Sequence, residues 1–261
     1  MTTLVVTGAA SGIGKGISLE AASRGMHVAM LDVDEEALAA AADEARSAGA
    51  AAVVPIICDV SDEAQVVGAF DLVESGLPLI SGVVANAGVE VSESLFDASV
   101  DDWDRVMAVN LKGTFLTARS ALRYWRRAER GGSLVCVSSP SAFVGFAGGS
   151  NTAYGASKGG ISAFVRAAAL DAAPAGIRVN AVVPGATDTD MLYFGLQGQA
   201  LADRRAELAH AAKTQIPLGR MARTDEIAKA VLWLAGDESA YVTGSHLICD
   251  GGLLAKGANT F

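Results

Sequence analysis

The chain has 261 residues, of which 51% are hydrophobic and 19% are charged, and its formal net charge is −9. This composition excludes a disordered chain, and the negative balance argues against a nucleic-acid surface, which needs a basic face. No long uncharged apolar run marks a membrane helix, and the amino terminus enters a short strand without the features of a signal peptide, so we expect a cytoplasmic protein.

Strand and helix signals alternate along the chain. Apolar and β-branched runs predict strands at residues 3–7, 26–31, 52–58, 80–85, 132–138, 176–183 and 245–249. Helical spacing lies between them, at residues 15–24, 34–48, 62–75, 100–127, 152–173, 192–214 and 224–234. We therefore predict an α/β fold in which a Rossmann-like, doubly wound parallel β-sheet of about seven strands has helices on both faces. Residues 1–261 form a single domain, since no repeat or linker divides them.

The first strand runs directly into a glycine-rich turn that reads Gly-Ala-Ala-Ser-Gly-Ile-Gly. Glycines let the backbone approach a pyrophosphate, and the free N–H groups at the start of the next helix receive its charge. The spacing is G-x-x-x-G-x-G rather than G-x-G-x-x-G, and such a turn alone is weak evidence. The candidate cofactor contacts in it are Gly8, Ser11, Gly12, Ile13 and Gly14.

The second strand ends at Asp32, about 20 residues past the glycines. A carboxylate at this place accepts hydrogen bonds from an adenosine ribose and repels a 2′-phosphate, which favours NAD over NADP. Lys15 would favour NADP if it faced the cofactor, but a lysine just inside a helix is typical of a solvated surface. Asp32 as a simple loop carboxylate also stays open.

Polar and small residues follow the next two strands. After the third strand, Asp59 can meet an adenine amino group while Val60 covers the ring. After the fourth, the small residues of Asn86-Ala87-Gly88 allow close approach of a flat ring. Asn110 lies within the apolar stripe of the helix at 100–127, where it needs partners if buried, so it is either a structural bridge or part of a proton path.

Tyr154 stands four residues before Lys158, so on a helix the two side chains share one face about a turn apart. A tyrosine with a pKa of ~10 is a poor base at neutral pH. A lysine cation and the positive ring of an oxidised nicotinamide would both stabilise its phenolate. The pair is our candidate catalytic centre, although this spacing also occurs on many solvated helix faces.

In this order the residues resemble the classical short-chain dehydrogenase/reductase family over nearly the whole chain. The matching positions are Thr7 to Gly14, Asp59-Val60, Asn86-Ala87-Gly88, Asn110, Ser139, Tyr154, Lys158, Pro184-Gly185 to Thr189, and Asp250-Gly251-Gly252. Each motif is weak alone, whereas the ordered set is specific.

The resemblance implies roles for these residues. Tyr154 is then the general acid/base, Lys158 lowers its pKa and bonds the nicotinamide ribose, and Ser139 holds the substrate oxygen. Asn110 is implied to bend its helix and to keep a water-linked proton path open. The further implied cofactor contacts are Pro184, Gly185, Thr187 and Thr189, of which the last bonds the nicotinamide carboxamide.

Two positions depart from the family pattern. Ser139 lies fifteen residues before Tyr154, two more than is usual, whereas Ser141 has the usual count. We prefer Ser139 because it directly follows a strand and the long loop after it can absorb two residues. Ala85 stands where many members have asparagine, which costs one polar contact.

The resemblance implies an NAD(H)-dependent oxidoreductase that interconverts a secondary alcohol and a ketone or aldehyde. The alternatives are an NADPH-dependent carbonyl reductase of the same family and a non-catalytic nucleotide-binding sensor or scaffold. A substrate lid is expected at about residues 187–215. The loop before Tyr154 and the lid both carry apolar side chains. These side chains either line a mostly apolar substrate pocket or pack against the body of the protein or another subunit. They are Phe143, Val144 and Phe146 in the loop, and Met191, Leu192, Tyr193, Phe194 and Leu196 in the lid.

Two remaining predictions concern partners and metals. The helix that carries Tyr154 is rich in small residues, which lets another helix approach closely. Family members pair this helix across subunits, so we expect a homotetramer. The small residues are Gly159, Gly160, Ala163, Ala167 and Ala168. Cys58, Cys136 and Cys249 are odd in number and far apart, so we predict buried free thiols, no disulfide and no zinc site.

Overall fold

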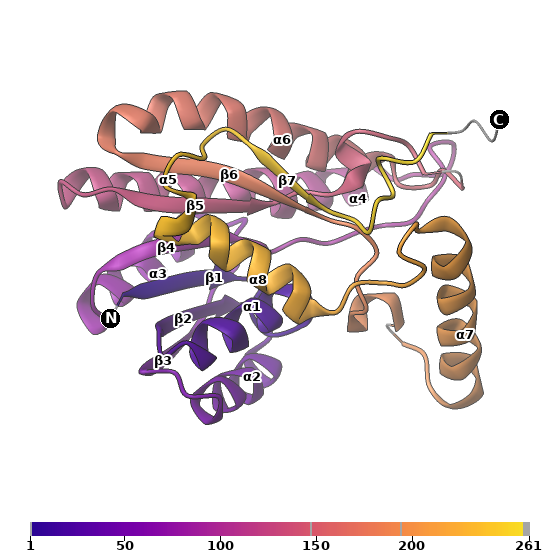
Figure 1. The fold of residues 1–261 in the computed structure, drawn as a ribbon, viewed down its shortest axis with the longest axis horizontal. Helices are drawn as coiled ribbons and strands as arrows, with labels where there is room; N and C mark the ends of the chain where they lie inside the picture. The colour runs from indigo at the N-terminus through magenta and orange to yellow at the C-terminus, as the bar shows by residue number, and fades with distance from the viewer. Residues whose placement is uncertain (1, 147, 194, 258–261) are drawn as a thin grey trace.

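A computed structural model describes residues 2–146, 148–193 and 195–257. Its seven parallel strands lie in the order β3-β2-β1-β4-β5-β6-β7, and Figure 1 shows them as one twisted sheet. The strands are β1 (Thr3–Thr7), β2 (His27–Asp32), β3 (Ala52–Ile57), β4 (Ile80–Ala85), β5 (Gly132–Val137), β6 (Ile177–Pro184) and β7 (His246–Cys249). The predicted doubly wound α/β fold is confirmed.

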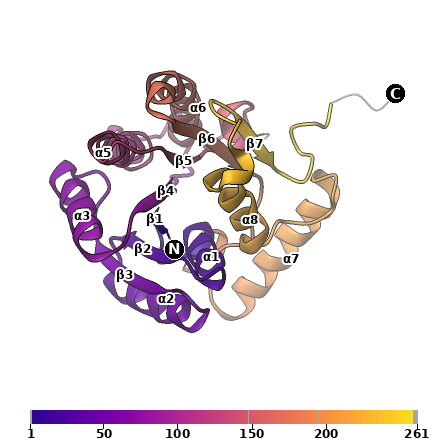
Figure 2. The ribbon, with the colours of Figure 1, turned by 60° about the vertical axis from the view of Figure 1, so that its left-hand side comes forward.

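Helices cover both faces of the sheet. They are α1 (Gly12–Ser23), α2 (Glu35–Ser47), α3 (Glu63–Gly76), α4 (Val100–Val106), α5 (Gly113–Arg127), α6 (Thr152–Ala172), α7 (Gly198–Gln215) and α8 (Thr224–Ala235). Figure 2 shows α5 and α6 on one side of the sheet and α1 and α8 on the other. Within the part of the chain that the structure describes, no helix combines the length and the apolarity needed to cross a membrane.

The sheet separates two hydrophobic cores because successive side chains of a strand point to opposite faces. In β1, Val5 packs into the core beneath α3, α5 and α6, whereas Leu4 and Val6 pack into the core beneath α1, α2 and α8. Both faces of the central strands are therefore buried. This is the reason for the continuous apolar runs in the sequence.

The long helix predicted at 100–127 is interrupted. A widened π-helical turn at Met107–Lys112 separates α4 from α5. Val106 and Asn110 are buried, but Trp103 is 38% exposed and Phe115 is 42% exposed. The apolar stripe expected along this helix is thus not buried at either aromatic residue. Trp103 precedes the wide turn, whereas Phe115 follows it, where the turn has rotated the helix face.

The predicted lid helix is also shorter than expected. Residues Asp190–Tyr193 form a single 3-10 turn, and α7 begins only at Gly198. Gly195 and Gly198 both adopt positive φ, which ends one turn and starts the next helix. In Figure 1, α7 stands apart from the layered body. Phe194 and the side chain of Met191 lie outside the described residues.

The strand order reverses between β1 and β4, and this is where ligands bind in open α/β sheets. The two strands are fastened at their carboxyl ends. Asn86 donates from Nδ2 to the carbonyls of Thr7 (2.9 Å) and Gly8 (3.1 Å), and its backbone N–H donates to the Thr7 hydroxyl (3.0 Å). The turn after β1 is thus held directly against the end of β4.

This close approach predicts that a methyl group at Gly14 is not tolerated. A Cβ there would lie 2.0 Å from the Gly8 carbonyl oxygen and 2.5 Å from Asn86 Nδ2. We expect Gly14→Ala to lower the free energy of unfolding by about 1–3 kcal/mol in urea denaturation. The matched control is Gly68→Ala in α3, where a Cβ meets nothing within 4 Å and the protein should become slightly more stable. Equal stability of the two variants would contradict the prediction.

Candidate active site

A cavity of about 610 Å³ opens at the carboxyl ends of the strands. This volume is typical of small-molecule sites. The lining brings together most of the residues that the sequence indicated: Gly8, Ser11, Gly12, Ile13, Asp32, Asp59, Val60, Asn86, Ala87, Gly88, Tyr154, Lys158 and Thr189. The other candidates are not part of the lining: Gly14, Asn110, Ser139, Pro184, Gly185 and Thr187.

The glycine-rich turn presents backbone to this cavity. Gly8 and Gly12 adopt left-handed φ values of 64° and 53°. Ser11, the N-cap of α1, makes no capping hydrogen bond, and the first turn of α1 contains no acidic residue. The first N–H groups of a helix have no partner inside it. The turn therefore has the open backbone and positive helix end that suit a phosphate group.

The Asp32 carboxylate is fixed on the wall of the cavity. Its Oδ2 accepts from the Ala10 N–H (2.9 Å), and its Oδ1 accepts from the N–H groups of Val33 (2.8 Å) and Asp34 (3.2 Å). Oδ1 thus has two donors, whereas Oδ2 has one and keeps a lone pair for a further donor. Lys15 lies elsewhere, in a surface ion pair with Glu44 (2.8 Å). A negative charge, and not a lysine, thus faces the space that an adenosine ribose would take.

Three further residues that line the cavity are the acidic Asp59, the apolar Val60 and Gly88, which has no side chain. Asp59 Oδ1 accepts from the N–H (2.8 Å) and the hydroxyl (2.7 Å) of Ser61, which orients the carboxylate. Val60 is buried against α5. At Gly88 a Cβ would come within 3.4 Å of Asn110 Oδ1 and 3.5 Å of Lys158 Nζ. A flat ring therefore has room above Gly88 that a larger side chain would fill.

Asn110 is fully buried inside the π-helical turn and joins two other segments. Its Oδ1 accepts from the Val89 N–H (2.8 Å), and its Nδ2 donates to the Val89 carbonyl (2.9 Å) and to the Ser157 hydroxyl (3.0 Å). The side chain is thus a structural bridge from the loop after β4 to α6. The wide turn is what aims Asn110 inward, away from the surface face of its helix.

Helix α6 places Tyr154 and Lys158 on one face, with Lys158 Nζ 5.4 Å from the centre of the tyrosine ring. Lys158 is buried, and its Nζ donates to the Val137 carbonyl at the end of β5 (2.9 Å). Burial lowers the pKa of the amine to about 8, while Cys136 and Glu90 act in the opposite direction. The ammonium is therefore held in place by one backbone oxygen.

The protein raises the pKa of Tyr154 to about 12. Burial is the largest cause, the Glu90 carboxylate adds to it, and a hydrogen bond from Ser139 opposes it. The resemblance implied a lowered pKa, but Lys158 is not among the groups that shift this phenol. The protein groups alone thus keep the phenol neutral, as a proton donor requires.

The two candidate serines differ in their surroundings. Ser139 is buried, and its hydroxyl accepts from the Ser141 N–H (3.2 Å) and donates to Ser141 Oγ (3.2 Å). It also lowers the pKa of the Tyr154 phenol, against the effect of burial. Ser141 lies in a 3-10 turn, and its Oγ accepts from Asn151 Nδ2 (3.4 Å). Ser139 therefore lies beside the reacting phenol, whereas Ser141 also faces the loop.

Of the candidate cofactor contacts in the segment after β6, Thr189 lines the cavity, whereas Thr187 and Gly185 do not. Thr189 lies next to the glycine turn, since a Cβ at Gly12 would come within 3.5 Å of it. Thr187 is buried and donates to the Gly185 carbonyl (3.0 Å), so its hydroxyl does not line the cavity. Gly185 has no room for a side chain because its Cβ would lie 2.6 Å from the Cα of Asp250. These two residues hold the edge of the sheet.

Other lining residues carried no motif in the sequence: Val33, Cys58, Ser61, Val89, Arg105, Ala108, Val109 and Val137. Arg105 and Lys158 are the two cationic side chains among the described lining residues, and Arg105 pairs with Asp102 (3.1 Å). The packing of α4 against α6 accompanies its place at the cavity, and no sequence spacing indicates such a contact. Of the cysteines, Cys58 and Cys136 are buried as predicted, but Cys249 is half-buried because β7 is an edge strand.

Of the apolar side chains that we expected in a substrate pocket, those that the structure describes are not part of the lining of this cavity: Phe143, Val144, Phe146, Leu192, Tyr193 and Leu196. Phe143, Val144 and Phe146 are 42–48% exposed on the loop before α6, and Leu196 is also exposed. The Phe143 ring contacts His246 edge-on, with 5.7 Å between ring centres. The described parts of the loop and the lid therefore carry exposed apolar surface.

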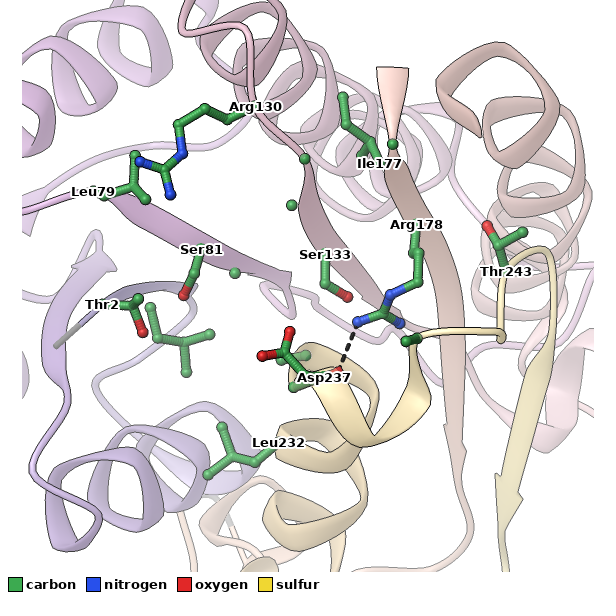
Figure 3. Close-up of a pocket in the computed structure, with 18 of the residues that line it drawn as sticks. Thr2, Leu79, Ser81, Arg130, Ser133, Ile177, Arg178, Leu232, Asp237 and Thr243 are labelled. Atoms are coloured by element: carbon green, nitrogen blue, oxygen red, sulfur yellow. Dashed lines mark hydrogen bonds between the residues drawn. The ribbon is translucent and has the colours of Figure 1, made fainter. Parts of the chain in front are cut away.

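A larger cavity of about 870 Å³ lies at the opposite, amino ends of the strands (Figure 3). Its most buried charged group, Arg178, donates to the carbonyls of Leu234 (2.9 Å) and Gly236 (2.8 Å) and to the Ser239 hydroxyl (2.8 Å). The guanidinium thus closes the end of α8. None of the candidate residues faces this cavity, so we place the chemistry at the carboxyl ends.

Comparison with known proteins agrees with this arrangement. A family model described as enoyl-(acyl carrier protein) reductase matches residues 8–254. A 3-oxoacyl-(acyl-carrier-protein) reductase of Thermotoga maritima is 37% identical, with 96% of each chain covered. A cis-4-hydroxycyclohexanecarboxylate dehydrogenase of Sinomonas cyclohexanicum is 40% identical, also with 96% of each chain covered. The crystal structure of a short-chain type dehydrogenase/reductase from Mycobacterium marinum superimposes with a TM-score of 0.89 at 32% identity, covering 98% of this chain and 96% of that one.

The fold, the glycine turn and the Tyr154–Lys158 pair define a nicotinamide-dependent oxidoreductase class. The chain belongs to the short-chain dehydrogenase/reductase family.

Proposed function

We propose that this protein is an NAD(H)-dependent oxidoreductase that interconverts a secondary alcohol and a ketone or aldehyde. One observation carries the proposal: a single cavity has the glycine turn and Asp32 in one part and Tyr154 with Lys158 in another. A dinucleotide bound along this cavity would have its adenosine ribose near Asp32 and its nicotinamide near Tyr154. The bound nicotinamide supplies the hydride chemistry.

The residues of the chain supply proton transfer and positioning. Tyr154 exchanges the proton of the substrate oxygen, and the buried Ser139 hydroxyl, which lowers the pKa of the same phenol, holds that oxygen. Lys158, fixed by the Val137 carbonyl, bonds the nicotinamide ribose and supplies positive charge near the phenol. Asn110 positions these groups by joining the loop after β4 to α6, and its turn leaves a proton path behind the lysine.

Several residues are proposed to hold the cofactor. Gly8, Ser11, Gly12, Ile13 and Gly14 receive the pyrophosphate, and Asp32 binds the adenosine ribose hydroxyls. Asp59 and Val60 face the adenine, Asn86-Ala87-Gly88 lie under the nicotinamide ribose, and Thr189 meets the carboxamide. Pro184, Gly185 and Thr187 contribute indirectly, because they fix the backbone of the segment that carries Thr189.

We also propose a mostly apolar substrate and a homotetramer. The exposed aromatic side chains before α6 and the lid support the first. The exposed Trp103 and Phe115, together with the exposed Ala163 and Ala167 of α6, support the second, because another subunit can pack on exposed apolar side chains. Gly160 and Ala168 instead pack within the subunit. The Sinomonas relative is named as the dehydrogenase of a ring alcohol, which also supports an alcohol substrate.

Loss of the Tyr154 hydroxyl should separate catalysis from binding. We expect Tyr154→Phe to lower kcat by about 10²–10⁴, because general acid/base catalysis contributes that much. NADH binding, followed by tryptophan fluorescence, should stay unchanged. The control is Tyr241→Phe, since Tyr241 is fully exposed. Full activity of Tyr154→Phe would contradict the role of Tyr154, whereas an unaltered protein that binds NADH without any turnover would favour a sensor or scaffold.

The two serines should differ in the same assay. Ser139→Ala removes the donor beside the phenol and should lower kcat by about 10²–10³. Ser141→Ala should cost much less, because its hydroxyl contacts Asn151 and Ser139. The reverse order of activities would assign the substrate oxygen to Ser141 and give this chain the usual family spacing.

Asp32 should select the cofactor. We expect NADH to bind at least about tenfold more tightly than NADPH, a difference of ~1.4 kcal/mol, and Asp32→Asn to remove most of that difference. Lys15→Gln is the matched control, because the Glu44 partner holds that ammonium at the surface. Equal or tighter NADPH binding by the unaltered protein would instead favour an NADPH-dependent carbonyl reductase.

A further inference from the structure

The turn that follows β5 carries Ser139 and ends at Phe143. Backbone hydrogen bonds close it, because the Ala142 N–H donates to the Ser139 carbonyl (3.0 Å) and the Phe143 N–H donates to the Pro140 carbonyl (2.9 Å). The ring of Pro140 further restricts the backbone at the start of this 3-10 turn. The position of Ser139 therefore depends on where Phe143 lies.

The Phe143 ring packs on an imidazole from the edge of the sheet. His246, the first residue of β7, contacts it edge-on, with 5.7 Å between the ring centres and 86° between the ring planes. Edge-to-face ring pairs at this separation attract one another. Phe143 is otherwise exposed. The ring pair thus ties the end of the turn after β5 to β7, a segment that is far away in the sequence.

His246 is held by the sheet and not by the loop. Its backbone pairs with Ala181 of β6, and its side chain is half-buried, with no partner for the buried Nε2 among the described residues. A charged imidazole would place an unpartnered N–H at this atom, which is costly. Burial and the Arg166 cation lower the pKa of His246, and the backbone of Ser162 opposes them. The neutral ring is therefore favoured, and it packs as an aromatic side chain.

The start of the same turn is fastened to α6. Ser138 Oγ donates to the Lys158 carbonyl (3.2 Å) and shares a hydrogen bond with Ser162 Oγ (2.9 Å). All three residues are buried. Ser139 follows directly. The turn is thus held at its start by the helix that carries Tyr154 and at its end by β7.

We propose that His246 is a positioning residue for the reaction: its ring holds Phe143, and Phe143 holds the turn that presents Ser139 to the substrate oxygen. The inference rests on the proposed alcohol dehydrogenase function and adds to it a residue outside the cavity. His246 is not part of the cavity lining. It therefore acts through the turn and not by contact with the substrate or the cofactor.

Variants at His246 separate positioning from binding. The assay is the oxidation of cyclic secondary alcohols with NAD, beginning with cyclohexanol. We expect His246→Ala to lower kcat about fivefold to tenfold, because a small displacement of Ser139 weakens a bond made in the transition state. KM and NADH binding should stay nearly unchanged. His246→Phe keeps an aromatic ring and should restore most of kcat. The matched control is His27→Ala, which removes a half-buried imidazole at the amino end of β2 and should leave kcat unchanged.

Double variants show whether the effect runs through the turn. In protein that already carries Phe143→Ala or Ser139→Ala, adding His246→Ala should lower kcat by less than about twofold, because residues that act as one unit are not additive. In protein that carries Phe96→Ala, the same change should keep its full effect, since Phe96 is an exposed ring on another loop. Phe143→Ala alone, at an exposed position, tests the contact if His246→Ala folds poorly.

A second measurement needs no substrate. The chain has three histidines, so proton NMR of the histidine rings can follow each one. The signal that disappears in His246→Phe belongs to His246. Phe143→Ala should shift that signal, because the neighbouring ring has been removed, and should leave the signals of His27 and His210 in place.

The outcomes separate the two proposals. Unchanged kcat in His246→Ala, no recovery in His246→Phe, effects that multiply in the double variants, or an unshifted His246 signal overturns the positioning role while the alcohol dehydrogenase function stands. If the unaltered protein binds NADH but oxidises no secondary alcohol with NAD or NADP, the proposed function fails and the inference fails with it. A lower kcat that recovers with an aromatic ring, together with non-additive double variants, supports both.

Discussion

The buried ammonium of Lys158 is the constraint on which the rest of the site depends. A charge out of water is costly unless it has partners, and here the Val137 carbonyl at the end of β5 is the direct partner. The bond requires α6 to cross the carboxyl ends of the sheet at a fixed height, and this position also sets Tyr154 over the cavity. The bridge from Asn110 to Ser157 holds α6 there from the other side. The catalytic pair is thus a consequence of how α6 packs.

The second constraint is the close contact between the turn after β1 and the end of β4. Asn86 bonds two carbonyls of that turn, and Gly14 has no room for a Cβ. The same contact leaves the first N–H groups of α1 open to the cavity. Residues that bind no ligand directly therefore decide whether a phosphate can approach. Gly185 has a similar role at the other edge, where it packs on Asp250.

Sequence reasoning predicted the sheet and most of the cavity because both follow from local patterns. Apolar runs of five to eight residues locate buried parallel strands, and the candidate residues directly follow those strands. The family resemblance implied a bend at Asn110, but the residue pattern alone did not predict the π-helical turn, because the Asn110 side chain bonds Val89 and Ser157, which are distant in sequence. Arg105 was missed for a similar reason. Its place at the cavity accompanies the packing of two helices, and no spacing rule describes that.

The state of the Tyr154 phenol connects structure to direction of reaction. Burial and Glu90 hold its pKa at about 12, so the protein alone keeps the proton on the phenol. This state suits reduction of a carbonyl, in which the tyrosine must donate. Oxidation of an alcohol needs the phenolate, which positive charge from Lys158 and from an oxidised nicotinamide ring would stabilise. A reduced ring would lack that charge, so under the proposed function the redox state of the cofactor would shift the same side chain between acid and base. Glu90 raises the pKa of Tyr154 and therefore favours the acid.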